Sequence, residues 1–255
     1  MISGFNYSDN KKQGPSGYIP RDYDKDPVGF SIPEFTGKVY PRSEWDELID
    51  LQEKNQSSPF HWHAQDCEIK SQARTNFCWC FGTVSGVETR YAMTGINPPN
   101  LSPTSTACLI KNFRNEGGWG TEACRGIQEY GIAEHRHWPT NSFDRSLPIR
   151  HDVRSNMHLH DLIDFEDLGY NRFDAVMSAL LDPYDPSPVT GGFMYSFSGP
   201  HLVLCLRAVK VGDEYGIVFA NSWGKNWGVE GYGVLVGRDA IPQEAVRIGS
   251  VKPRS

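Results

Sequence analysis

The chain of 255 residues carries 25 Lys and Arg against 31 Asp and Glu, a formal charge of −6. This acidic balance argues against a protein that coats nucleic acid. Hydrophobic residues make up 38%, enough to bury a sizeable core, which excludes wholesale disorder. The 25 glycines, 17 prolines and 31 aromatic residues indicate many turns around an aromatic-rich core and do not fit a plain helical bundle.

The six cysteines are too few for a disulfide scaffold of this length. The first residues, MISGFNYSDNKKQG, lack the apolar core of a secretory signal. We therefore expect a protein that is not secreted by a signal peptide and is cytoplasmic or part of a larger particle. The longest uncharged stretch, residues 186–206, contains prolines and glycines that a membrane-spanning helix tolerates poorly, so no membrane partner is expected.

We interpret the first 60 residues as an extended arm, followed by one domain over residues 61–255. The arm is rich in Gly, Pro, Asp, Lys and Tyr, with one helical candidate from Ser43 to Glu53 in which Trp45 and Leu48 share a face. A polar arm of this kind needs a surface to lie on, supplied by its own domain or by a protein partner.

Helices come before strands in the rest of the chain. Small and apolar residues recur at helical spacing from Phe77 to about Tyr91, with Thr75 or Asn76 as the cap. Further helices are predicted over 121–130 and 172–181, and short Val-, Leu- and aromatic-rich runs predict an antiparallel sheet over 192–195, 201–211, 215–220 and 231–237. This order predicts an α+β protein with two lobes and a cleft between them.

Cys78 stands at the start of the predicted central helix, six residues after Gln72. A helix N-terminus favours the thiolate. His201, at the head of a strand, and Asn221 complete the parts of an acyl-transfer triad. The imidazole would take the proton from Cys78, the Asn221 amide would orient the ring, and Gln72 with the Cys78 backbone N–H would stabilise the oxyanion.

These residues make the chain resemble the papain-like cysteine proteases, the papain and cathepsin family, over roughly residues 66–236. Gln72, Cys78, Trp79 and Phe81 fall where that family has its oxyanion glutamine, nucleophile, adjacent tryptophan and helix phenylalanine. Asn221-Ser-Trp-Gly matches the family's asparagine motif. His201 and Asn221 follow Cys78 by 123 and 143 residues, against about 130–150 in the family.

The resemblance implies a papain-like fold, with a helical lobe whose central helix begins at the nucleophile and a lobe built on an antiparallel β-sheet or barrel. It implies that Gly117 and Gly118 bind peptide backbone. Trp119 would border the pocket for the second residue on the acyl side, and Trp223 would shield the bond between Asn221 and His201. The substrate would be a peptide or protein, with no cofactor.

The sequence also departs from the family. Thr75-Asn76-Phe77 replaces the Cys-Gly-Ser before the nucleophile, and Asn115 replaces the partner half-cystine, a joint loss that suits a reducing environment. Phe77 beside the oxyanion site and Pro200 before His201 are expected to narrow specificity or impair turnover. The arm does not resemble the long helical inhibitory propeptide of secreted relatives, so a conventional zymogen is not expected.

Other interpretations of the same residues stay open. Cys78 could be a buried core cysteine, as we expect for Cys80, and Gly117-Gly118 could form a plain turn. Three histidine pairs would each share one side of a strand, but none has the close spacing typical of zinc sites, so no metal is expected. These pairs are His61 with His63, His135 with His137, and His158 with His160.

Two hypotheses follow. The first is a thiol peptidase that hydrolyses peptide bonds through Cys78, His201 and Asn221 by way of a thioester; the same residues could serve acyl transfer or deamidation. The second is a structural or docking component of a larger assembly, for example a virus particle. It would have a papain-like fold with reduced or lost activity, and its arm would bind an assembly partner.

Overall fold

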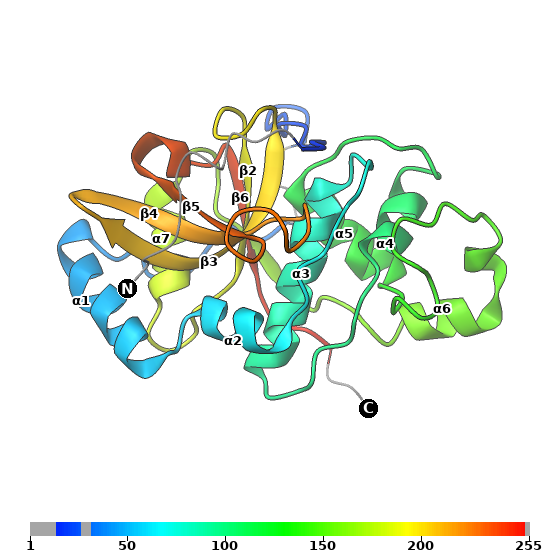
Figure 1. Ribbon diagram of the computed structural model, residues 1–255, viewed down its shortest axis with the longest axis horizontal. Helices are drawn as coiled ribbons and strands as arrows, with labels where there is room; N and C mark the ends of the chain where they lie inside the picture. The colour runs from blue at the N-terminus through cyan, green and yellow to red at the C-terminus, as the bar shows by residue number, and fades with distance from the viewer. Residues whose placement is uncertain (1–13, 27–31, 253–255) are drawn as a thin grey trace.

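The computed structural model describes residues 14–26 and 32–252 and places a helical lobe beside a sheet lobe (Figure 1). The parts of the predicted arm at 1–13 and 27–31 lie outside the described residues. The helical lobe contains α3 (Cys78–Met93), α4 (Pro103–Ile110), α5 (Gly120–Tyr130), the 3₁₀ turn η2 (Leu147–Ile149) and α6 (His151–Met157). The predicted two-lobe α+β architecture is confirmed, including the helices expected over 121–130 and 172–181.

The sheet lobe is built on six antiparallel strands in the order β1-β6-β2-β3-β4-β5. Three of the four predicted strands agree closely with the structure, but the run expected at 192–195 forms earlier, and β1 and β6 were missed. β1 has three residues, and β6 begins with a glutamate, so neither gives a clear alternating pattern. The strands are β1 (Phe165–Asp167), β2 (Val189–Phe193), β3 (His201–Val211), β4 (Glu214–Ala220), β5 (Tyr232–Val236) and β6 (Glu244–Ile248). The 3₁₀ turn η3 (Gly237–Ala240) lies between β5 and β6.

Helix α3 passes between the lobes and is buried at every residue except Met93. Its two glycines allow the sheet to approach. A Cβ at Gly82 would lie 2.7 Å from Leu202, and one at Gly86 would lie 2.9 Å from Ile248. The central helix is confirmed, but its predicted side-chain cap is wrong: the N-cap residue is Phe77, with no side-chain cap bond.

Helix α1 (Arg42–Asn55) confirms the helical candidate of the arm and packs on the sheet lobe. Trp45 is fully buried, and Gln52 Nε2 donates to the backbone oxygen of Leu180 in α7 (Phe173–Leu181). A second helix, α2 (Pro59–Asp66), follows beneath β3. Among the described residues, no helix has the length and apolar character needed to span a membrane.

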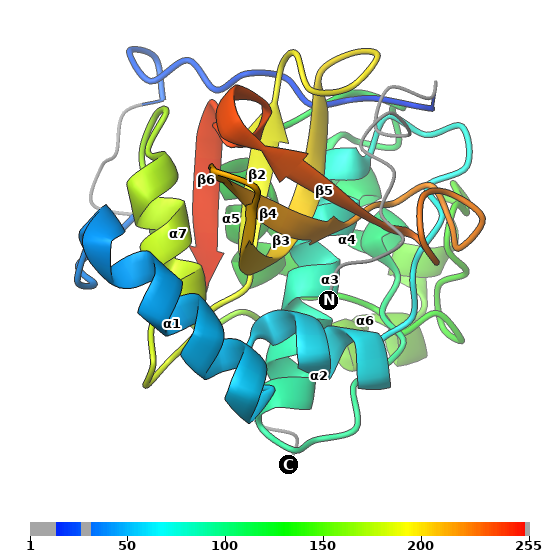
Figure 2. The same cartoon turned by 60° about the vertical axis from the view of Figure 1, so that its left-hand side comes forward.

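The arm segment, defined here as residues 14–26, crosses the upper edge of both lobes above the ends of β2, β3 and β6 (Figure 2). The surface on which this segment lies is therefore its own domain.

Candidate active site

Cys78 is the first residue of α3 and is fully buried. Backbone hydrogen bonds from Leu202, Trp79, Tyr18 and its own amide favour the thiolate, but burial outweighs them and raises the pKa of the thiol to about 12. The Leu202 amide belongs to the residue after His201, so the sulfur lies at the start of β3. In this covered arrangement the thiol is neutral.

His201 and Asn221 meet because neighbouring strands carry them. His201 is the first residue of β3, and Asn221 follows the last residue of β4, which pairs with β3. The distance from His201 Nε2 to Asn221 Oδ1 is 2.8 Å, so Nε2 donates and Nδ1 keeps its lone pair. Nδ1 has no hydrogen-bond partner among the described residues, and burial lowers the pKa of His201 to about 4.

Trp223 lies against the His201 ring, with ring centroids 4.5 Å apart, and Phe197 meets the same ring edge-on. Both aromatic rings cover the His201 imidazole, which is fully buried. That Trp223 shields the bond between Asn221 and His201 stays a prediction.

Gln72 is fully buried and held at both ends of its side-chain amide. Its Oε1 accepts a short hydrogen bond from Ser222 Oγ, and its Nε2 donates to the Thr75 backbone oxygen at 2.7 Å. The Gln72 amide nitrogen carries two N–H groups, and the bond to Thr75 uses one of them. Ser222 was not among the predicted site residues, although it stands directly after Asn221 in the quoted motif.

Phe77 lies in the hydrophobic core, and Pro200 contacts the arm segment. The Phe77 ring is fully buried in the helical lobe, stacked on Phe143 at 5.5 Å, so it packs into the core beside α3. Pro200 accepts a hydrogen bond from the Gly17 amide at 3.4 Å through its backbone oxygen. The Phe77 side chain thus fills part of the hydrophobic core, and its effect on specificity or turnover, like that of Pro200, stays a prediction.

Asn76 and Asn115 connect the two segments that the missing disulfide would join. The Asn76 backbone amide donates to Asn115 Oδ1 at 2.7 Å, and the Asn76 side chain donates to the Asn115 backbone oxygen at 3.1 Å. Hydrogen bonds thus replace a covalent connection here, and all six cysteines are free.

Gly117 and Gly118, called the glycine wall below, lie against the arm segment. The Gly118 amide donates to the Gly17 oxygen at 2.9 Å, and the Ile19 amide donates to the Gly118 oxygen at 2.9 Å, which makes a parallel bridge centred on Tyr18. Through Gly118 the wall therefore binds peptide main chain in this structure, and the peptide is the chain's own. Trp119, the N-cap residue of α5, has its ring 5.4 Å from the Lys111 ammonium.

Two glycines of the arm segment, Gly14 and Gly17, allow it to pack closely against the rest of the domain. A Cβ at Gly17 would lie 2.0 Å from the Asn76 backbone oxygen, and one at Gly14 would lie 2.4 Å from the Trp223 ring. Trp223 Nε1 also donates to the Pro15 oxygen at 2.8 Å. The Tyr18 ring is buried beside Gly192, whose absent Cβ makes room for it. Paired glycines around a Pro-Ser pair were the available sequence signal for this fit.

The histidine pairs do not lie on strands, as the sequence had predicted that they would. His61 and His63 lie on helix α2 rather than on a strand, and His63 Nδ1 is hydrogen-bonded to Tyr232 Oη at 2.8 Å. Neither His135 nor His158 lies in a strand. Over the described ranges 14–26 and 32–252, no group of three or more His, Cys, Asp or Glu side chains suits a metal ion.

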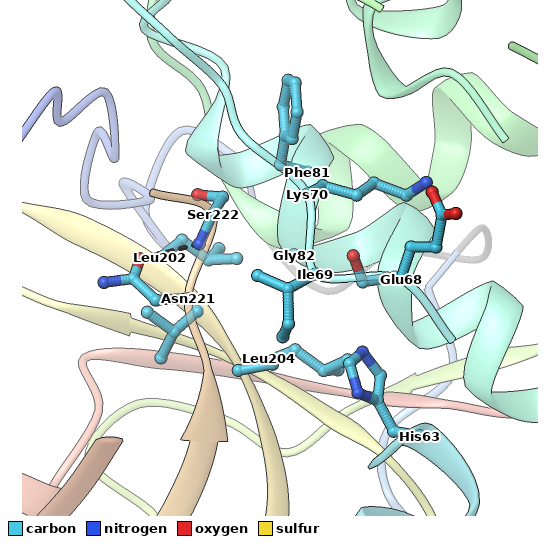
Figure 3. Close-up of a pocket in the computed structure, with 13 residues that line it drawn as sticks. His63, Glu68, Ile69, Lys70, Phe81, Gly82, Leu202, Leu204, Asn221 and Ser222 are labelled. Carbon is cyan, nitrogen blue, oxygen red and sulfur yellow. Dashed lines mark hydrogen bonds between the residues drawn. The ribbon is translucent and has the colours of Figure 1, made fainter. Parts of the chain in front are cut away.

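A small cavity of about 10 Å³ lies behind the site (Figure 3). Asn221 and Ser222 border it on one side, His63 on the other, and Ile69 projects between them. This volume holds one water molecule at most. The cavity therefore belongs to the supporting structure behind Ser222 and does not receive a substrate side chain.

This geometry combines a helix-borne cysteine, an oriented histidine and a main-chain binding wall, the features of a papain-type thiol hydrolase. The family model described as papain family cysteine protease matches residues 57–246, and the chain belongs to this family.

The relatives are distant in sequence. Human cathepsin O is 22% identical over 86% of this chain and 75% of its own length; bovine pro-cathepsin H is 26% identical over 64% of this chain and 54% of its own. Among solved structures, proCathepsin B S9 from Trypanosoma congolense has a TM-score of 0.64 at 17% identity, covering 99% of this chain and 92% of that one. Xylellain from Xylella fastidiosa has a TM-score of 0.63 at 15% identity, covering 94% and 98%. These structures share the fold.

Proposed function

We propose that the protein is a cysteine peptidase that hydrolyses peptide bonds through Cys78, His201 and Asn221, and that the arm segment holds it latent. The observation that carries the proposal is the 2.8 Å bond from His201 Nε2 to Asn221 Oδ1, which leaves Nδ1 without a hydrogen-bond partner among the described residues. Family membership and the position of Cys78 at the start of α3 support it.

In the proposed reaction, His201 Nδ1 takes the proton of the Cys78 thiol, and the sulfur attacks the substrate carbonyl carbon. The oxyanion accepts hydrogen bonds from the free N–H of Gln72 and the backbone N–H of Cys78. The imidazolium then protonates the leaving amine, the C–N bond breaks and a thioester remains. Water, deprotonated by His201, releases the acid and restores the thiol.

The arm segment supports a latent state in two ways. It occupies the main-chain bonding positions of Gly118, and it takes part in burying a thiol with a pKa of about 12 beside an imidazole with a pKa of about 4. While the arm segment covers the site, the Cys78 thiol and the His201 imidazole are both neutral at neutral pH. Release of the segment would hydrate them and allow the thiolate–imidazolium pair to form. Because the arm segment lies on its own domain, it does not support the hypothesis that the arm docks the protein onto an assembly partner.

The test is labelling with a thiol-directed epoxide, with the modified residue located by mass spectrometry, alongside hydrolysis of a fluorogenic peptide. The assay uses the full chain and the variant Arg21→Met, which should loosen the arm segment because it removes the 2.7 Å ion pair between Arg21 and Asp167. We expect Cys78→Ala to abolish labelling at this site and to lower hydrolysis at least about 10⁴-fold, and Gln72→Ala to lower it about 10²-fold. Cys80→Ala, two residues away in the core, is the matched control. Labelling that does not depend on Cys78 in folded protein would sink the proposal.

A further inference from the structure

A buried carboxylate outside the triad joins the two lobes. Glu244 is the first residue of β6 in the sheet lobe, where its backbone pairs with Gly192 of β2. The residue is 1% exposed. Its side chain reaches α5 of the helical lobe, which lies next to β6 in Figure 2.

The Glu244 carboxylate caps the N-terminus of α5. Oε2 accepts from the Gly120 amide at 3.0 Å, and Oε1 accepts from the Thr121 amide at 3.0 Å and from Thr121 Oγ1 at 3.2 Å. The first amides of a helix have no partner within the helix, and the N-cap residue Trp119 supplies no side-chain bond. A carboxylate at this end also interacts favourably with the helix dipole. Glu244 therefore supplies the cap from the opposite lobe.

This cap is two residues from the glycine wall. Gly118 exchanges two 2.9 Å main-chain bonds with the arm segment, and Gly120 is the residue that Glu244 holds. The start of α5 has little freedom of its own, because a Cβ at Gly120 would lie 3.0 Å from Thr190 Oγ1 and 3.2 Å from Val246. The position of Gly118 relative to the sheet lobe is thus fixed largely through Gly120.

We propose that Glu244 is a positioning residue that fixes the glycine wall against the sheet lobe and so sets how firmly the wall binds a peptide main chain. For a substrate peptide this rests on the proposed function. For the arm segment it does not, because those bonds are present in the structure whether or not the protein hydrolyses peptides.

The same arrangement makes the wall sensitive to pH. Burial raises the pKa of Glu244 to about 7, whereas separation of α5 from β6 would hydrate the carboxylate and return its pKa toward 4.5. The arrangement in which α5 and β6 are in contact therefore binds a proton more tightly than the separated one. Contact between α5 and β6 is stabilised as the pH falls below about 7, and this stabilisation is lost as the pH rises through 7. Among the described residues, the titratable groups that interact with Glu244 are Arg21, Asp167, Tyr18, Tyr23 and Cys124.

The experiment is residue-resolved hydrogen exchange on the full chain at Gly118 and Ile19, corrected for intrinsic base catalysis, between pH 6 and 8.5. In the wild type we expect exchange to rise about tenfold over this range, because a pKa of about 7 in the joined state against 4.5 after separation favours the joined state about tenfold at pH 6 and hardly at all at pH 8.5. Glu244→Gln cannot ionise and should lose this dependence. Glu244→Ala should exchange about tenfold faster than the wild type at pH 6, because the first amides of α5 lose the oxygen acceptors that cap them.

Glu129→Gln is the matched control, since it removes an exposed carboxylate from the other end of the same helix. If Glu244→Ala does not fold, the pH dependence of exchange in Glu244→Gln tests the proposal by itself. An inflection near pH 7 that survives in Glu244→Gln, or unchanged Gly118 exchange in folded Glu244→Ala, would overturn the proposal. Exchange needs no turnover, so an inactive wild type would contradict the proposed function and leave this test intact.

Discussion

The two halves of the arm segment are held by different forces. Residues 15–19 lie over the site through main-chain bonds: the Gly17 oxygen and the Ile19 amide bond to Gly118, and the Pro15 oxygen bonds to Trp223. Residues 21–26 are held by side-chain charges. The Arg21 guanidinium, with a side chain 0% exposed, pairs with Asp167 at 2.7 Å and with Asp26 at 3.0 Å.

The first half of the arm segment can therefore be displaced by a competing peptide, whereas the second half anchors the segment to the domain. Any extended peptide can make the main-chain bonds of the first half, so that half can be displaced by another peptide. The Arg21 pair depends on two particular side chains and has no equivalent in a generic peptide. The anchor therefore keeps the covering half at a high local concentration over the site.

Breaking the anchor should have the largest effect. Arg21→Met leaves the Asp167 carboxylate, 1% exposed, without its cation, which costs about 3 kcal/mol or more for a buried pair. Release of the arm segment should then rise about 100-fold. The measurement is the rate of Cys78 alkylation in native protein. Arg42→Met removes an exposed pair with Asp174, 3.0 Å long, and should change the rate little. Equal rates in the two variants would show that Arg21 is not the anchor.

Disrupting the fit over the site should have an intermediate effect. In Gly17→Ala the new Cβ would meet the Asn76 backbone oxygen at 2.0 Å, so the segment must shift. A cost of about 2 kcal/mol, typical of a steric clash at a close approach, would speed Cys78 alkylation about 30-fold. The control is Gly199→Ala, whose Cβ would make an ordinary 3.4 Å contact with Ser16. A rate that stays at the wild-type value in Gly17→Ala would contradict the described seating.

Removing one main-chain contact should have the smallest effect. Trp223→Phe keeps an aromatic ring beside His201 but loses the 2.8 Å bond to the Pro15 oxygen, a loss of about 1 kcal/mol and about fivefold in alkylation rate. Trp227→Phe is the control, because Trp227 Nε1 has no hydrogen-bond partner among the described residues. If both variants alkylate at the same rate, the bond to Pro15 does not hold the segment.

Local patterns predicted much of the fold. The helical spacing of small residues identified α3, and the apolar runs identified β3, β4 and β5 nearly to their ends. β6 could not be found in this way, because Glu244 breaks its apolar pattern. That carboxylate is buried only because α5 supplies amide donors from 123 and 124 residues earlier in the chain.

The sequence by itself determined the family and the identity of the candidate triad, since residue types at characteristic spacing carry that information along the chain. The tertiary structure decided what lies over the site. Gly17, Tyr18 and Arg21 form no periodic pattern, and their partners at Gly118, Gly192 and Asp167 are about 100 residues or more away. It also decided the charge state: Cys78 and His201 are neutral because burial disfavours ions, and burial is a property of the folded chain.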